Sequence, residues 1–306
     1  MDELALGSLL ASTLRVATPL IFGALAGVLA ERSGVIDLGL EGKMLLAAFA
    51  AGATGAVAGS TALALGAAVL VAVAASWLHG FACVTYRGDQ VVSGMAINII
   101  AAGLTVVLAI AWFHVGGQTP AVADSVRLHP LIAGDSPLAQ NALVYLALLL
   151  VPAVWWLLYR TRFGLRLRAV GENPYMVEAA GVSVPKLRYA ALTLNGVLCG
   201  LAGSYLTLAQ GASFSPNMTA GRGYMALAAM IFGHWRPVPA FGACLLFGFL
   251  DAAAIRLQGV TLPGFGAVPV QAIQALPYLL TVALLAFFIG RNVSPAALGR
   301  PFVKEH

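Results

Sequence analysis

Recurring apolar segments are the feature that most constrains this chain. Runs of apolar residues long enough to cross a bilayer follow one another along most of the 306 residues, and a membrane-spanning helix needs about 20 of them. Only 9% of the residues are charged, against about a quarter in soluble domains. The alternating ten-residue strands of a membrane β-barrel are absent from the sequence. We therefore predict an all-α polytopic membrane protein.

The apolar pattern predicts about nine transmembrane helices, within a range of about eight to ten. They are expected at residues 14–30, 44–59, 61–82, 91–113, 142–158, 190–210, 224–233, 241–255 and 272–289. Two of these runs are short for a full crossing, and each follows a polar, glycine-containing segment, at 31–43 and at 213–223. This arrangement predicts discontinuous helices, which membranes tolerate only where protein or a water-filled cavity satisfies the freed backbone.

One interior segment, residues 159–188, is strongly basic and holds six of the 17 Lys and Arg residues. The positive-inside rule makes this loop cytoplasmic, and alternation of the spans then places the amino terminus outside. The net charge of +5 is thus explained by topology, and we expect no nucleic-acid partner. Within the loop, Asn173 as N-cap, Pro174 as first helical residue and Gly181 as terminator predict a short helix at 174–180.

An internal repeat relates the two polar interruptions. A shift of 181 residues aligns 42–52 with 223–233, with six identities in eleven positions. The abundance of Ala and Gly leaves chance as an alternative. The aligned spans would cross in opposite directions, which is an inverted-topology repeat. We expect one membrane domain over 1–306, with a first repeat at about 14–113, a second at about 190–289, and the cytoplasmic loop 159–188 between them.

Polar side chains in or beside the predicted spans are the candidates for a translocation path, because ionisable groups are costly there. They are Asp37, Glu41, Ser93, Asn98, Asn195 and Arg222. Two alternatives stay open: the acids face the cytoplasm at a helix end, or the uncharged residues only bond neighbouring helices. Glu41 and Arg222 are equivalent in the repeat, and we predict an ion pair between them.

The sequence contains no catalytic constellation, no metal-ligand spacing and no nucleotide-binding glycine motif. We therefore expect no enzyme activity, no catalytic residue and no metal site in this chain. The three cysteines lie in apolar surroundings at unrelated spacings, and we predict buried packing roles for them.

Three stretches resemble a known family: ERSGVIDLGLEGKMLLAAF at 31–49, RTRFGLRLRAVGENPYMVEAAGV at 160–182 and MTAGRGYMALAAMIFGHWRPVPA at 218–240. QVVSGMAINII at 90–100 extends the likeness across most of the chain. The sequence resembles the permease subunits of bacterial ATP-binding-cassette (ABC) importers of the branched-chain amino acid and simple sugar type, and most of all the nucleoside import permeases.

The resemblance implies a multi-pass protein of the bacterial inner membrane, surrounded by lipid, that imports nucleosides. A separate ATPase subunit would bind the ATP, so that this chain needs no cofactor. The residues matching its docking segment are Asn173, Pro174, Glu178, Ala179, Ala180 and Gly181. A second permease subunit, identical or homologous, and an extracytoplasmic solute-binding protein are the other implied partners.

Two alternatives remain for the function. A ribose-like simple sugar importer shares the general pattern of the family. An ion-coupled secondary transporter would also suit an inverted repeat, but it has no use for a basic loop that presents a capped helix.

Overall fold

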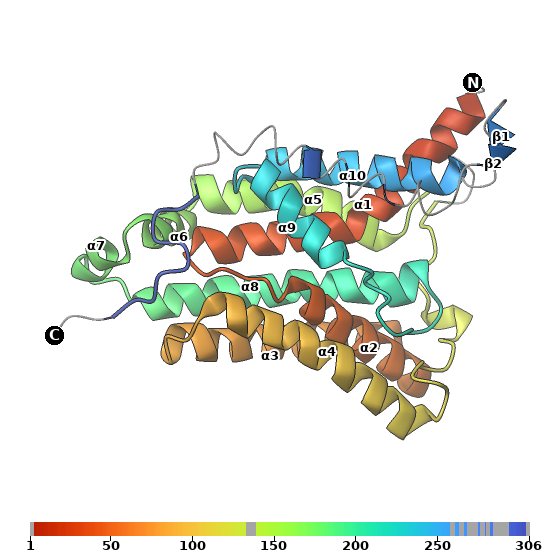
Figure 1. The fold of residues 1–306 in the computed structure, drawn as a ribbon, viewed down its shortest axis with the longest axis horizontal. Helices are drawn as coiled ribbons and strands as arrows, with labels where there is room; N and C mark the ends of the chain where they lie inside the picture. Colours follow the sequence, from red (N-terminus) through yellow and green to blue (C-terminus); the bar gives the residue numbers. More distant parts are fainter. Residues whose placement is uncertain are drawn as a thin grey trace.

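The computed structural model describes residues 3–132, 139–257 and 294–303, with eight separate positions between 258 and 293. Over these residues the chain is a bundle of long, roughly aligned helices (Figure 1). Seven are long and apolar enough to span a membrane: α1 (Glu3–Arg32), α2 (Leu40–Ala58), α3 (Thr61–Gly80), α4 (Gln90–Phe113), α5 (Ala142–Arg160), α8 (Val184–Tyr205) and α10 (Pro237–Leu257).

The remaining elements are short. Three are α-helices: α6 (Arg162–Glu172), α7 (Pro174–Ala179) and α9 (Arg222–Phe232). The π-helical turns η1 (Phe81–Thr85) and η3 (Leu206–Gln210) extend α3 and α8, and a 3₁₀ turn η2 (Asp124–Val126) lies between α4 and α5. Strand β1 (Thr261–Leu262) pairs antiparallel with β2 (Gly266–Ala267).

These elements confirm the predicted all-α membrane fold. Eight of the nine expected spans correspond to helices, but α9 has only 11 residues and is too short to cross alone. The ninth, at 272–289, lies outside the described residues except for isolated positions. Of the helix starts, Asp89 and Asn141 cap α4 and α5 by accepting backbone N–H bonds.

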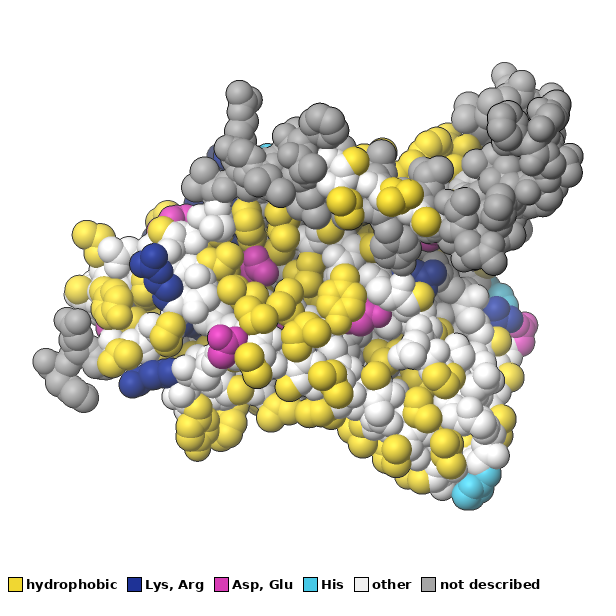
Figure 2. Space-filling view, in the orientation of Figure 1, with side chains coloured by type: hydrophobic (Ala, Val, Ile, Leu, Met, Phe, Trp, Pro, Cys, Tyr) yellow, Lys and Arg dark blue, Asp and Glu magenta, His cyan; other side chains and the backbone are white. Residues whose placement is uncertain are grey.

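Burial separates an inner from an outer group of helices. In the apolar spans of α1, α2 and α8, 72–83% of the residues are buried, against 28–33% in α3, α4, α5 and α10. The outer helices carry large exposed apolar side chains such as Leu70 and Ile99, which suit a lipid environment. Figure 2 shows a largely apolar face with Lys and Arg toward its ends and several acidic groups nearer its middle.

Two of the inner segments are broken, as the sequence predicts. Residues 33–39 between α1 and α2 are not helical, and neither are residues 211–221 between η3 and α9. Helices α1 and α8 cross the bundle in opposite directions, and α2 and α9 also run oppositely (Figure 1). The two halves therefore have the inverted arrangement that the repeat indicates.

The basic segment of the chain lies at one end of the bundle. Helices α6 and α7 and residues 294–303 lie at one end, and the described amino terminus lies near the other (Figure 1). The turn before α10 lies at the α6–α7 end as well, since the Arg32 guanidinium at the end of α1 donates to the carbonyls of His234 and Trp235. Because the basic segment 159–188 contains α6 and α7, it lies at this end too. All three cysteines are free and buried, as predicted, and Cys199 and Cys244 belong to the main apolar core.

Candidate functional site

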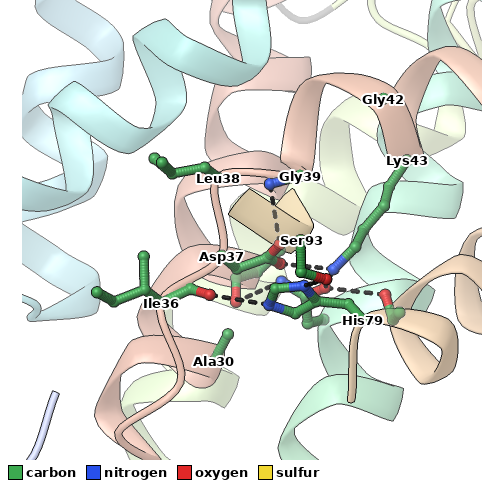
Figure 3. Close-up of polar contacts among 12 residues, drawn as sticks. Ala30, Ile36, Asp37, Leu38, Gly39, Gly42, Lys43, His79 and Ser93 are labelled. Atoms are coloured by element: carbon green, nitrogen blue, oxygen red, sulfur yellow. Dashed lines mark hydrogen bonds and ion pairs between the residues drawn. The ribbon is translucent and has the colours of Figure 1, made fainter. Parts of the chain in front are cut away.

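A buried ion pair stands at the first helix break. Asp37, in the non-helical segment, and Lys43, in the first turn of α2, have fully buried side chains with Nζ and Oδ2 2.7 Å apart. The other Asp37 oxygen accepts the backbone N–H of Gly39 at 3.2 Å. Figure 3 shows both side chains directed toward each other, with His79 and Ser93 beside them. The pair thus ties the broken segment to the start of α2.

Asn195 of α8 extends this cluster to two further helices. Its Oδ1 accepts from Lys43 Nζ at 3.1 Å and from Ser76 Oγ of α3 at 3.0 Å. Its Nδ2 donates to the carbonyl of Ala26 in α1 at 3.0 Å. A single amide therefore links α1, α2, α3 and α8.

The backbone of the break is held by side chains from α3 and α4. His79 Nε2 lies 2.9 Å from the carbonyl oxygen of Ile36, and its Nδ1 lies 3.0 Å from Ser93 Oγ. The N–H of Ile36 donates to Gln90 Oε1 at 2.6 Å. Both backbone groups of Ile36 are thereby satisfied by side chains, as an unwound segment in a membrane requires.

The second feature of the site is a groove of about 320 Å³ beside the starts of α2 and α9. Its lining combines polar groups with apolar ones: Glu41, Gly42, Leu45, Met95, Asn98, Ile99, Ala102, Asn217, Thr219, Ala220, Gly221 and Tyr224. Asn98 of α4 is central to it. Its Oδ1 accepts the N–H of Gly42 at 2.8 Å, and its Nδ2 donates to Leu38 O and to Tyr224 Oη.

Glu41 joins the two repeats in this groove. Its two carboxylate oxygens accept the backbone N–H groups of Gly221 and Gly223 at 2.8 and 2.6 Å. Residue 223 has to be glycine for this approach, because a Cβ there would lie 2.6 Å from Glu41 Cα. The first N–H groups of a helix have no partner within the helix, and they lie at the positive end of its dipole. The carboxylate of α2 therefore satisfies an anion-binding position with a group of the chain itself.

The predicted ion pair between Glu41 and Arg222 is not formed. The segments meet as the repeat indicates, but Glu41 bonds backbone groups, and the Arg222 guanidinium donates to the carbonyl of Met218 at 3.1 Å. Lys43, by contrast, forms a buried ion pair with Asp37. The Glu41 carboxylate is stabilised by the N–H groups at the start of α9 and not by the predicted guanidinium of Arg222.

The six candidate path residues thus fall into two groups. Asp37, Ser93 and Asn195 belong to the buried cluster, while Glu41 and Asn98 line the groove and Arg222 lies at its edge. Sequence reasoning missed Lys43, His79, Ser76 and Gln90. The available signal for Lys43 was its place six residues after the opposite charge of Asp37, directly before an apolar run.

The predicted short helix is present at the basic end. Asn173 Oδ1 accepts the N–H of Met176 at 3.2 Å, and Pro174 is the first residue of α7. Gly181 follows with φ +79°, a conformation that ends the helix. Tyr175, Met176, Ala179, Ala180 and Gly181 are exposed, so α7 presents an apolar, small-residue surface to its surroundings.

Two inverted broken helices that start beside a polar groove are typical of membrane transporters. The chain also matches the family described as branched-chain amino acid transport system, permease component, over residues 9–289, and it belongs to that family. It is accordingly a multi-pass protein of the cytoplasmic membrane and a transport component.

Several relatives match nearly the whole chain, and three of them show the range of their names. The guanosine ABC transporter permease NupQ of Bacillus subtilis is 37% identical, covering 96% of this chain and 95% of its own. The nucleoside ABC transporter permease NupC of Lactococcus lactis is 36% identical, with 97% of each chain covered. TsgC13 of Haloferax volcanii, provisionally named a glucose ABC transporter permease, is 34% identical over 97% of this chain and 98% of its own.

Proposed function

We propose that this chain is the permease subunit of an ATP-driven nucleoside importer. The observation that carries the proposal is the groove where α2 and α9 begin, since the solute sites of transporters lie between broken helices of this kind. Its uncharged polar groups, Asn98, Asn217 and Tyr224, suit the hydroxyls and ring nitrogens of a nucleoside. The one carboxylate there is engaged with the N-terminus of α9.

The nucleoside assignment draws on the relatives, two of which are named for nucleoside or guanosine transport at 36% and 37% identity. The relative named for glucose makes a simple sugar the second candidate. A sugar and a nucleoside share hydroxyl groups, but only the nucleoside has a planar base that gains from an apolar wall. Leu45, Met95 and Ile99 supply such a wall in the groove.

The exposed surface of α7 is the proposed docking site for the ATPase subunit. Asn173 and Pro174 fix the start of the helix, and Glu178 fixes the connection that follows, since its Oε2 accepts the N–H of Val184 at 3.1 Å. Ala179, Ala180 and Gly181 leave room for a partner to approach closely. The positive-inside rule supports a cytoplasmic location for this end.

Copurification and uptake test the proposal together. A tagged chain isolated from its native membrane should carry an ABC ATPase, a second permease subunit and, under mild conditions, a solute-binding protein. The complex reconstituted into liposomes should take up a labelled nucleoside when ATP is supplied in the compartment that the ATPase subunit faces. Unlabelled nucleosides should compete, whereas glucose and ribose at the same excess should not. Competition by the sugars alone would favour the sugar importer, and uptake driven by an ion gradient without ATP would refute both.

A further inference from the structure

The described carboxy-terminal residues 295–302, which we term the strap, connect two parts of the molecule that are far apart in sequence. One is the cytoplasmic unit of α6 and α7, and the other is the first helix break at 33–39. We propose that the strap transmits movement of α7 to this break, and that Phe302 is the positioning residue at its α7 end. The proposal rests on the ATPase docking at α7 described above.

The Phe302 end of the strap packs against helices α6, α7 and α8. Phe302 is 8% exposed and forms a small apolar cluster with Val170 of α6, Val177 of α7 and Val184 of α8. Its ring centroid lies 5.3 Å from that of Tyr175 in α7. This cluster is separate from the main core of the bundle. Phe302 is therefore in direct contact with the helix that the ATPase would move.

The middle of the strap is held by hydrogen bonds on both of its sides. The N–H of Ala297 donates to the carbonyl of Gly171 in α6 at 2.8 Å, and the N–H of Gly299 donates to the carbonyl of Gly34 in the break at 3.1 Å. The buried guanidinium of Arg188 adds a third link, since its Nη2 donates to Arg300 O at 3.4 Å and its Nε to Ser33 O at 3.3 Å. The strap thus bridges α6 and the break.

Gly299 brings the strap against the side chain of Ile36. Its φ is +76°, and a Cβ at this position would lie 2.8 Å from Ile36 Cδ1. The backbone of Ile36 is bonded to His79 and Gln90, and the next residue, Asp37, pairs with Lys43 of α2. Contacts therefore run without interruption from α7 through the strap to the start of α2, where Glu41 lines the groove.

Contiguous contact alone does not prove coupling, so the test has to measure it. Phe302→Ala removes the α7 end of the strap, and Gly299→Ala disturbs the other end, near Ile36. Val303→Ala is the matched control, because Val303 follows Phe302 directly but is 43% exposed. Phe302→Leu restores an apolar side chain of intermediate size. Each variant is studied in the whole reconstituted complex for bound ATPase, ATP hydrolysis and uptake.

We expect Phe302→Ala to retain the ATPase and to hydrolyse ATP, but to lose about fivefold or more in solute imported per ATP, the low end of coupling between sites. Phe302→Leu should recover most of the loss, and Val303→Ala should match the wild type. Because both ends act through one strap, the double variant Gly299→Ala with Phe302→Ala should be no worse than the worse single change.

Unchanged import per ATP in Phe302→Ala would overturn the proposal, and so would losses that simply multiply in the double variant. Release of the ATPase by Phe302→Ala would also overturn it, since the residue would then serve docking. If Phe302→Ala does not accumulate in the membrane, Gly299→Ala carries the same expectation alone. A wild-type complex without an ATPase or ATP-driven uptake would instead refute the proposed function, so the two failures are distinguishable.

Discussion

At the scale of single residues, Glu41 is the group that most shapes the groove. Both of its carboxylate oxygens bond backbone N–H groups at the start of α9, a position where helices ordinarily attract phosphates and other anions. Since the chain supplies its own anion, a negatively charged solute finds no free positive end of α9. The groove then favours neutral polar compounds.

The first prediction concerns Glu41→Gln. The amide keeps one acceptor oxygen but turns an NH₂ donor toward a backbone donor, which leaves a buried group unsatisfied at a cost of about 1–3 kcal/mol. We expect ATP-driven uptake to fall by about tenfold, the change that 1.4 kcal/mol produces in a rate. Asp124→Asn, on an exposed acid outside the groove, is the control for loss of one charge. Normal uptake by Glu41→Gln at equal protein level would show that transport does not need the carboxylate at the start of α9.

The second prediction is that a charge swap does not rescue the groove. If Glu41 and Arg222 formed an ion pair, Glu41→Arg with Arg222→Glu would recover part of the activity lost in each single variant. In the structure their partners are backbone groups, so an arginine at 41 would face the N–H donors of α9. We expect uptake by the double variant to be no better than by the worse single one. Clear recovery would support a direct pair.

Much of this site could be anticipated from residue types, but not its division into two parts. Polarity in an apolar context identified Asp37, Asn98 and Asn195. Their grouping depends on how α3, α4 and α8 pack around the break, which no local pattern records. Lys43 was overlooked because a charged residue at the end of a polar segment is equally compatible with the cytoplasmic surface. The structure instead shows it to be fully buried.

At the scale of elements, the first break is held to its neighbours by hydrogen bonds and an ion pair. Asp37, Lys43, Asn195 and His79 bind the unwound segment to α1, α2, α3 and α8. Because buried charges are stabilised chiefly by their partners, the Asp37–Lys43 pair fixes where α2 begins. That position in turn places Glu41 and Gly42 at the groove.

The third prediction tests this pair through stability. Asp37→Asn alone leaves the buried Lys43 ammonium without its counter-ion, and Lys43→Met alone leaves the buried Asp37 carboxylate without its counter-ion. Each single change should lower the free energy of unfolding by about 3–5 kcal/mol. The double variant removes both charges and should be more stable than either single one. Thermal unfolding of the purified protein in detergent measures the order, with Lys186→Met, on an exposed side chain, as the control. A double variant as unstable as the two losses added together would contradict the argument.

Elements with strong local signals were predicted well. Asn173, Pro174 and Gly181 located α7 to within one residue, because capping and φ preferences act locally. The two breaks were found from glycines and charges between apolar runs. The number of membrane crossings was harder to predict. An 11-residue helix such as α9 is too short to cross a membrane alone and does so only together with another segment of the chain.

At the scale of the whole molecule, the groove at the starts of α2 and α9 is separate from the exposed surface of α7, so the proposed ATPase surface can be altered without changing the groove. The fourth prediction uses α7. Ala180→Asp places a charge on the exposed small-residue end of the helix, and Gly181→Val forces a branched residue to φ +79°. Both should reduce the ATPase recovered with the tagged chain, and uptake with it. Ala121→Asp, exposed in the loop after α4, is the control. Full ATPase recovery and uptake in both α7 variants would place docking elsewhere.

The fifth prediction concerns the charge of the solute that the assembled importer accepts. A nucleotide carries a phosphate that needs Arg, Lys or free backbone donors. In the groove, the N–H groups of Gly221 and Gly223 are already bonded to Glu41, and no Lys or Arg is among its lining residues in the described chain. The phosphate would also lie near the Glu41 carboxylate.

We therefore expect a nucleoside to compete strongly with labelled nucleoside uptake. Its 5′-monophosphate should compete at least about tenfold more weakly, since each 1.4 kcal/mol changes affinity by that factor. Measuring both inhibition curves with the reconstituted importer decides the matter. Equal inhibition by the two compounds would show that the groove at α9 does not set the charge of the solute.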